Sequence, residues 1–461
     1  MVQRTWWTVL GALAALRVAP PLLVLAAEGR DLPGFPRFDL VEGTGDDAGF
    51  YAAAREFMAS TARVRPLPAA LIAVLLVGGA AAGIRLRRRK RVLPWLVVGT
   101  ATSVALAVTV VVREMEPSGA AVFGWSLLWA APMLPYRALG LPLDYEIAFA
   151  FAFPLALSAN IAALVATAYA GFYATGRRAV GLTAAAALAI WPLLSAVVAG
   201  QSAWENGTWL VDTGLALYTE PLSTALVTVA LALVLRPGRT DVQLALAGVL
   251  LSYATFVKLT NGLALALAVV LVAGFLGLRR ALPLVAGSLS FVPALAAYWP
   301  IGYVQGEDGP NLLPQEPFAV DYAVRSWTDS LLFSPRTLMI LLPLAIVGVA
   351  VMRRGFALWL LLAFTLANGS LQLLPAHVSA STLPVRESPR LLRAARSRRP
   401  GGCRACAAAM SVRPAAHGGH RPRQARRPPA SCRIRSVTTA TRTRLRASTS
   451  QTIGSCATTS P

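Results

Sequence analysis

Two adjacent carboxylates, Asp46 and Asp47, follow the helix-breaking segment 43–45 and precede an apolar periodic run. An aspartate at a helix start accepts hydrogen bonds from free backbone amides, so one of the two is expected to cap a short helix. A carboxylate that is not used as a cap can accept a proton from a hydroxyl group, which is the task of a general base. The residues themselves leave the choice between helix cap and catalytic base open.

The helical register of this segment separates a polar face from an apolar one. Asp47, Tyr51 and Arg55 fall on the polar face. The apolar face holds Phe50, Ala54, Phe57 and Met58. We expect the polar face to meet a polar cavity and the apolar face to meet the membrane surface. Asp46 is the better placed of the two acids to act as the cap, while Tyr51 and Arg55 are candidate substrate-binding residues.

Glu220 and Lys258 are further candidates for substrate binding, and each stands at the expected end of an apolar run. Glu220 lies between Thr219 and Pro221, a pattern typical of a helix start, so it either caps the helix or lines a cavity and binds acceptor hydroxyls or a metal. The Lys258 ammonium group would either meet a lipid phosphate or extend to the membrane interface. Arg17, within the first apolar run, is expected to face other helices, either for structure or for function.

These residues are set in a chain dominated by apolar runs. Of its 461 residues, 56% are hydrophobic and only 14% are charged. Since a helix needs roughly 20 apolar residues to cross a bilayer, recurring runs of this kind predict an all-α polytopic membrane protein. The first run, 6–27, is expected to stay in the membrane, because its apolar part is too long for a cleaved signal peptide.

Short basic turns between the runs predict the orientation. They are Arg85–Arg91, Arg177–Arg178, Arg236 with Arg239, Arg279–Arg280 and Arg353–Arg354. Cytoplasmic turns are rich in such residues, and placing all of these turns inside gives about 11 transmembrane helices. The expected spans are 6–27, 68–84, 92–112, 147–174, 179–199, 215–235, 242–257, 260–278, 281–301, 337–352 and 356–374.

This topology has two consequences for the polar segments. Residues 119–135, with two tryptophans and two prolines, must form a re-entrant or interfacial segment on the outer face. The long loops would then all face the extracytoplasmic side: 28–67, 113–146, 200–214 and 302–336.

The C-terminal segment 376–461 differs from the transmembrane domain, 1–375, in composition. It carries 17 of the arginines, all four cysteines and all three histidines, so most of the net charge of +22 belongs to it. Two explanations are open: a shifted reading frame in a GC-rich gene, or a genuine disordered basic tail. Cys403, Cys406, His417 and His420 imitate a zinc ligand set without a periodic apolar surrounding, so we assign no metal there and no nucleic-acid partner.

The segment Gly45–Phe57 reads Gly-Asp-Asp-Ala-x-Phe-Tyr-x-x-Ala-Arg-x-Phe and follows the first expected span. It resembles the signature loop of the GT-C superfamily of integral membrane glycosyltransferases, which includes protein mannosyltransferases and bacterial aminoarabinose transferases. Segments 217–222, 256–262 and 332–338 are similar to stretches common in that superfamily. The resemblance covers roughly residues 5–374 and leaves the C-terminal segment outside it.

The resemblance implies that Asp46 or Asp47 is the catalytic carboxylate. It also implies a polyprenyl-phosphate sugar as donor and a glycan, lipid or protein acceptor of the cell envelope, with the site on the outer face of the plasma membrane. Cations or a divalent metal, Mg²⁺ or Mn²⁺, would stabilise the departing phosphate.

Two other functions remain open, a multi-pass transporter or flippase of lipid-linked sugars and an inactive, truncated relative. A transporter should show helices broken at mid-membrane and paired repeats. Because the acids gather in outer loops, the sequence favours surface chemistry. It contains no phosphate-binding loop and no dinucleotide fingerprint.

Overall fold

A computed structural model describes much of the chain but not all of it. Its described residues are 3–27, 46–64, 91–116, 123–199, 219–303 and 355–371, with the isolated positions 74, 77–79, 81, 217, 348 and 352. The chain divides into two units, Met1–Leu383 and Pro384–Pro461, and the second contains no described residue. The predictions for the Cys and His residues of the C-terminal segment, for the outer loop 302–336 and for most of the spans 68–84 and 337–352 therefore lie outside the described part.

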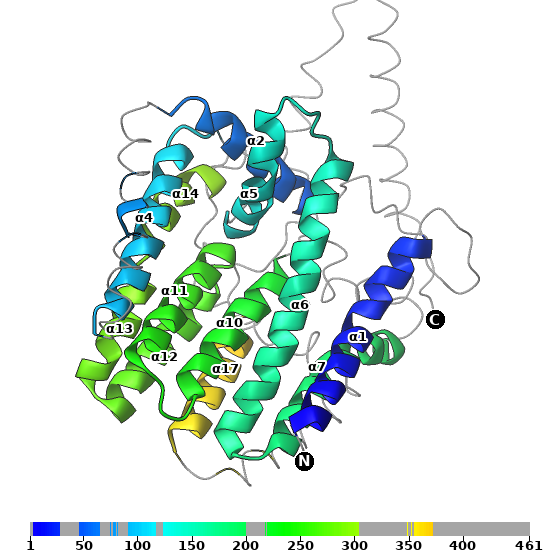
Figure 1. Cartoon of the computed structure of the whole chain (residues 1–461), viewed down its shortest axis with the longest axis vertical. Helices are drawn as coiled ribbons and strands as arrows, with labels where there is room; N and C mark the ends of the chain where they lie inside the picture. Colours follow the sequence, from blue (N-terminus) through cyan, green and yellow to red (C-terminus); the bar gives the residue numbers. More distant parts are fainter. Residues whose placement is uncertain are drawn as a thin grey trace, which may run out of the picture. The chain divides into compact units, whose positions relative to one another are not determined.

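The described part is all-helical, as predicted, and Figure 1 follows its helices along the chain. They are α1 (Gln3–Ala27), α2 (Asp46–Thr61), α4 (Leu93–Val112), α5 (Gly124–Ala138), α6 (Tyr145–Thr175), α7 (Arg178–Ala199), α10 (Glu220–Leu235), α11 (Asp241–Val257), α12 (Asn261–Leu276), α13 (Leu278–Ser288), α14 (Val292–Tyr303) and α17 (Phe356–Leu371).

Three helices, α1, α4 and α6, are long and apolar enough to cross a membrane, and the pair α13–α14 makes a fourth if it is counted as one span. That pair covers the expected span at 281–301 but is broken, because its two helices meet at a bend of 41°. The bend follows Gly287, and Pro293 stands in the first turn of α14, where a proline has no backbone N–H to leave unpaired. The other spans of the predicted set remain predictions.

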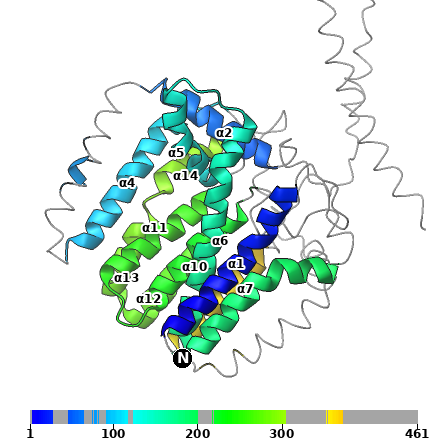
Figure 2. The same cartoon turned by 45° about the vertical axis from the view of Figure 1, so that its right-hand side comes forward.

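Two groups of helices surround α6 and α11. Helix α6 packs on α10, α7 and α1, whereas α11 packs on α13, α10 and α4. Helix α12 joins the second group through α13 and α11, and α17 packs on α12, an arrangement that can be followed in Figures 1 and 2. Alanine dominates the buried face of α6, and small residues of this kind let helix backbones approach closely in a membrane.

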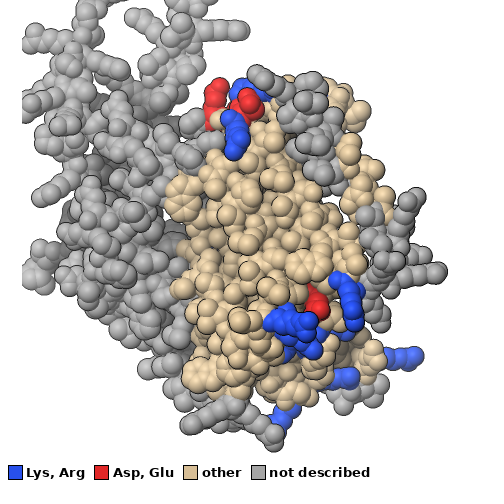
Figure 3. Space-filling view, turned by 90° about the vertical axis from the view of Figure 1, so that its left-hand side faces the viewer, with Lys and Arg blue, Asp and Glu red and all other residues tan. Residues whose placement is uncertain are grey.

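Charged side chains gather at two ends of the face shown in Figure 3, with a broad band between them that contains no Lys, Arg, Asp or Glu. Arg239 lies in the turn between α10 and α11, and Arg279 and Arg280 lie in the first turn of α13. The Arg239 guanidinium lies 4.9 Å from the centroid of the Phe356 ring and donates a hydrogen bond to the Val234 carbonyl at 2.8 Å. Burial, with a smaller contribution from Arg280, lowers the pKa of Arg239. An apolar band between charged ends is typical of a protein that sits in a bilayer.

Helix α2 packs on α5 and α4, which corrects the expectation that its apolar face meets the membrane surface. The residues predicted to form the apolar face are confirmed, since Phe50, Ala54, Phe57 and Met58 are all buried. The Phe57 ring lies 5.2 Å from that of Phe123, which precedes α5. Protein side chains therefore cover the apolar face of α2, and the helix is an integral part of the helical core.

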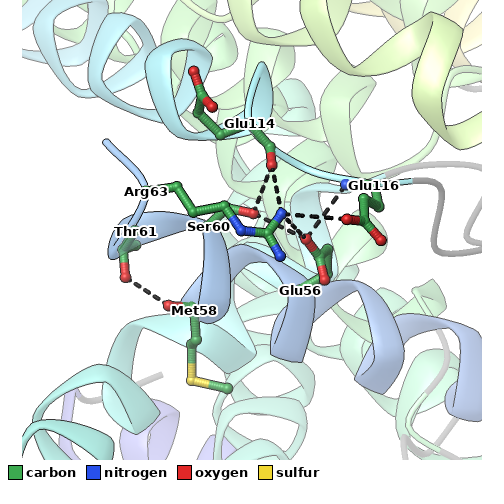
Figure 4. Close-up of polar contacts among 7 residues, drawn as sticks. All are labelled: Glu56, Met58, Ser60, Thr61, Arg63, Glu114 and Glu116. Atoms are coloured by element: carbon green, nitrogen blue, oxygen red, sulfur yellow. Dashed lines mark hydrogen bonds and ion pairs between the residues drawn. The ribbon is translucent and has the colours of Figure 1, made fainter. Parts of the chain in front are cut away.

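A polar network fixes the C-terminal end of α2 to the segment after α4 (Figure 4). Glu56 Oε1 accepts hydrogen bonds from Ser60 Oγ at 3.0 Å, Arg63 Nη1 at 3.2 Å and the Glu116 backbone N–H at 3.3 Å. Arg63 also donates to the Glu114 backbone carbonyl at 3.1 Å. Glu56 Oε1 thus accepts three hydrogen bonds, two from the end of α2 and the residues after it and one from the segment after α4.

We expect Glu56→Ala to loosen this end of α2 and to lower the free energy of unfolding by about 1 kcal/mol, a modest value because Arg63 is largely exposed. Amide hydrogen exchange of α2 and thermal unfolding in detergent measure the change. The matched control is Glu114→Ala, because the Glu114 carboxylate points away from the network and only its backbone carbonyl takes part (Figure 4). Equal effects of the two substitutions would contradict the assignment.

Candidate functional site

Helix α2 begins at Asp46, so the predicted helix start at the acid pair is confirmed. The side chains of Asp46 and Asp47 lie outside the described residues. Tyr51 and Arg55 share one face, as predicted, with the Arg55 guanidinium carbon 5.6 Å from the centroid of the Tyr51 ring. Arg55 is exposed and Tyr51 is half-buried.

The Tyr51 side chain packs among residues of α5 and α6. Its ring lies 5.3 Å from Tyr145 and 6.3 Å from Trp129, and its hydroxyl donates to the Leu143 carbonyl at 3.4 Å. Burial raises the pKa of Tyr51; Arg55 lowers it and Asp144 raises it by smaller amounts. The phenol therefore stays neutral at physiological pH and acts as a hydrogen-bond donor and not as a base.

Glu220 and Lys258, 38 residues apart in sequence, form an ion pair in which Lys258 Nζ lies 3.0 Å from Glu220 Oε1. The side chains are 33% and 31% exposed, respectively. Thr219, at the N-cap of α10, makes no side-chain capping hydrogen bond; its hydroxyl lies 3.5 Å from Glu220 Oε2. The helix start predicted at Glu220 is confirmed, since α10 begins there. The Glu220 carboxylate binds Lys258, the residue that directly follows α11.

Arg17 is buried within the bundle, as predicted, at 5% exposure. Its Nε donates to Asn160 Oδ1 of α6 at 2.9 Å, and its Nη1 donates to the Leu188 carbonyl of α7 at 3.0 Å. The predicted bond to a carbonyl of a neighbouring helix is confirmed. Arg17 thereby connects α1 to two helices at once.

Arg17 and Glu220 line the same cavity, which has a volume of about 140 Å³. The lining residues are Arg17, Asn160, Ala163, Leu188, Trp191, Glu220, Pro221 and Thr224. A guanidinium, a carboxylate, an amide and an indole converge here, a combination that can bind hydroxyl groups and an anionic group together. Asn160 stands near the middle of the 31-residue helix α6, roughly 22 Å from either end, so the cavity reaches deep between the helices.

The structure therefore brings together some predicted site residues and not others. Glu220 and Lys258 meet directly, and Glu220 shares the cavity with Arg17. The described contacts of Tyr51 and Arg55 are with α5, α6 and the segment between them, and none joins these two residues to the ion pair. Among the described residues no group of three His, Cys, Asp or Glu side chains is arranged to hold a metal. The side chains of Asp46 and Asp47 are not among them, so an Mg²⁺ or Mn²⁺ ion at the acid pair remains a prediction.

No protein-family model, no curated protein and no solved structure matches this chain. The likeness to GT-C glycosyltransferases therefore rests on the sequence segments quoted above.

Sequence reasoning missed several residues that line the cavity, among them Asn160 and Trp191. Asn160 carried a signal, because an amide inside a long apolar run must find a partner within the membrane. A second amide, Asn261 at the start of α12, joins α12 to α10 and α11 by donating to Ser223 Oγ at 2.8 Å and to the Ala254 carbonyl at 2.9 Å. For Trp191 the sequence gives no such signal, since tryptophans occur throughout the expected spans.

Proposed function

We propose that this protein is a membrane glycosyltransferase of the GT-C type, with about 11 transmembrane helices. It would transfer a sugar from a polyprenyl-phosphate donor to a hydroxyl of a cell-envelope acceptor on the extracytoplasmic face of the plasma membrane. The observation that carries the proposal is the acid pair at the start of α2. Helix α2 packs on α5, and α5 contacts α11, whose C-terminal end lies beside the Glu220–Lys258 ion pair. Figures 1 and 2 show α2 and α5 beyond the ends of α10 and α11 that carry this pair.

The proposed chemistry assigns each charged group a role. The acceptor oxygen forms a bond to the anomeric carbon while the bond from that carbon to the phosphate oxygen breaks, and the acceptor proton passes to Asp46 or Asp47. Positive charge from Lys258 stabilises the negative charge that the departing lipid phosphate gains. Tyr51 and Arg55 bind substrate beside the acids, and Glu220 binds acceptor hydroxyls or holds Lys258 in place.

The proposal is tested by transfer from a labelled polyprenyl-phosphate sugar, with Asp46→Asn and Asp47→Asn examined separately in the purified protein. We expect one of the two substitutions to lower the rate by roughly 10²- to 10⁴-fold, the usual contribution of a general base. Asp241→Asn, in the first turn of α11 at the opposite, basic end, is the control and should keep full transfer. Full transfer by both Asp46→Asn and Asp47→Asn would refute the catalytic assignment.

A transporter or flippase of lipid-linked sugars is the second candidate function, and two observations favour it. The pair α13–α14 is a broken helix, and Arg17 and Glu220 line a cavity near the middle of α6. Broken helices and buried charges at mid-membrane are features of transport pathways. Vesicles containing the protein and a labelled lipid-linked sugar separate the candidates. A flippase moves the lipid between leaflets and leaves the sugar on it, the transferase moves the sugar to an acceptor, and an inactive relative moves neither lipid nor sugar.

A further inference from the structure

The first residues of α5 contact the chain on both sides of the Glu220–Lys258 ion pair. On the Glu220 side, the buried Trp125 indole N–H donates to the Leu217 carbonyl at 2.6 Å. Leu217 has φ of 53°, a left-handed conformation that costs a residue with a Cβ roughly 1–2 kcal/mol. Leu217 stands three residues before Glu220, so the hydrogen bond holds a strained residue shortly before the start of α10.

On the Lys258 side, the contact is between backbones. A Cβ added to Gly124 would lie 2.7 Å from both the backbone nitrogen and Cγ2 of Val257, so only glycine allows α5 to approach this closely. The Tyr253 hydroxyl secures the approach by donating to the Gly124 carbonyl at 2.6 Å. Val257 is the last residue of α11 and precedes Lys258 directly.

We propose that Trp125 is a positioning residue that sets the geometry of the Glu220–Lys258 ion pair through its hydrogen bond to Leu217. Gly124 packs against Val257 at the end of α11, and Trp125 donates a hydrogen bond to Leu217 shortly before α10. The N-terminus of α5 therefore fixes the distance between the two backbone segments that carry the charges. Such a device is needed because partly exposed ion pairs gain little energy and do not order long side chains by themselves. The N-cap of α10 also lacks a side-chain hydrogen bond that would fix it.

The arrangement links the two groups of predicted site residues. Helix α2, which begins with the acid pair, packs on α5, and α5 in turn contacts Leu217, three residues before Glu220, and Val257, directly before Lys258. The catalytic meaning of this link rests on the proposed function. The positioning itself does not, because it is a statement about the geometry of two charges.

Trp125→Phe tests the proposal, since it keeps a buried aromatic ring and removes the N–H donor. Trp129→Phe is the matched control: Trp129 is equally buried on the same helix, and among the described residues its indole N–H has no hydrogen-bond partner. The readout is the coupling between Glu220→Gln and Lys258→Met, taken from thermal unfolding of the full chain in detergent as a double-mutant cycle. We expect the coupling to persist in the wild-type and Trp129→Phe backgrounds and to be lost with Trp125→Phe.

Equal coupling in the Trp125→Phe and Trp129→Phe backgrounds would overturn the proposal. A purely structural role for Trp125 would lower the unfolding temperature and leave the coupling intact. If Trp125→Phe does not fold, Tyr253→Phe decides the matter, because it releases the Gly124 carbonyl and keeps its ring. Loss of coupling there supports the proposal and retained coupling overturns it. None of these readouts uses sugar transfer, so the proposal and the proposed function fail separately.

Discussion

Replacing Gly248 by alanine is expected to drive α11 and α13 apart and to lower the free energy of unfolding by about 3 kcal/mol. A Cβ at this position would overlap the Leu284 carbonyl oxygen and would lie 2.9 Å from the Ser288 backbone nitrogen. Both are backbone atoms, so no change of side-chain rotamer relieves the overlap. The contact is reciprocal, because a Cβ at Gly287 of α13 would overlap the Ala245 carbonyl oxygen of α11.

Thermal unfolding in detergent measures the effect, with Gly99→Ala as the control. Gly99 lies inside α4, and a Cβ there would meet nothing within 4 Å. That substitution should be neutral or stabilise by up to roughly 1 kcal/mol, because alanine favours the helix over glycine. Since Gly248 and Gly287 belong to one contact, the double substitution should cost less than the sum of the two. Equal unfolding temperatures for Gly248→Ala and Gly99→Ala would show that the backbones do not pack this closely.

Much of the helical framework could be predicted from the sequence, because apolar run length and basic turns carry local information. The runs 92–112 and 242–257 correspond to α4, Leu93–Val112, and α11, Asp241–Val257, within a residue at each end. Residues 119–135 were expected to lie at the outer face and not to cross. Helix α5 covers Gly124–Ala138 and is about 22 Å long, too short for the hydrocarbon core.

The bend between α13 and α14 is indicated by a glycine and a proline in the sequence, which the length of an apolar run does not take into account. Gly287 and Pro293 stand on either side of the break, and both interrupt helices more often than they continue them. Hydropathy alone does not indicate the bend, because the residues at the break, Leu289 to Val292, are apolar except for Ser290 and so continue the apolar run. A rule that counts apolar residues therefore reports one span where two helices meet at 41°.

The candidate site depends on contacts that no local pattern encodes. Glu220 and Lys258 were each identified from a helix end, but their pairing requires α10 and α11 to pack in one particular register. Likewise, the α2 register predicted which residues form the apolar face, and only the packing on α5 shows what covers it. Sequence periodicity predicts which residues are buried, whereas the identity of the partner comes from the fold.

Arg17→Ala is expected to lower the free energy of unfolding by about 3 kcal/mol. It removes the donor to Asn160 Oδ1 and the donor to the Leu188 carbonyl, and hydrogen bonds to charged groups are worth roughly 1.5–3 kcal/mol each. The loss is partly offset, because placing an arginine at the centre of a membrane helix costs roughly 2.5–3.5 kcal/mol on insertion scales. Truncation also empties the volume filled by the long side chain at the junction of α1, α6 and α7.

Two further substitutions separate the charge of Arg17 from its shape. Arg17→Lys keeps the charge, but a single ammonium on a shorter stem cannot reach α6 and α7 as the guanidinium fork does, so its unfolding temperature should fall close to that of Arg17→Ala. Arg4→Ala, at an exposed position of the same helix, should change little. If Arg17→Lys matched the wild type, the charge and not the two-helix fork would hold α1. If Arg17→Ala were no worse than Arg4→Ala, the energetic cost of burying Arg17 would fully cancel its hydrogen bonds, and its place in the cavity would then have to be explained by ligand binding.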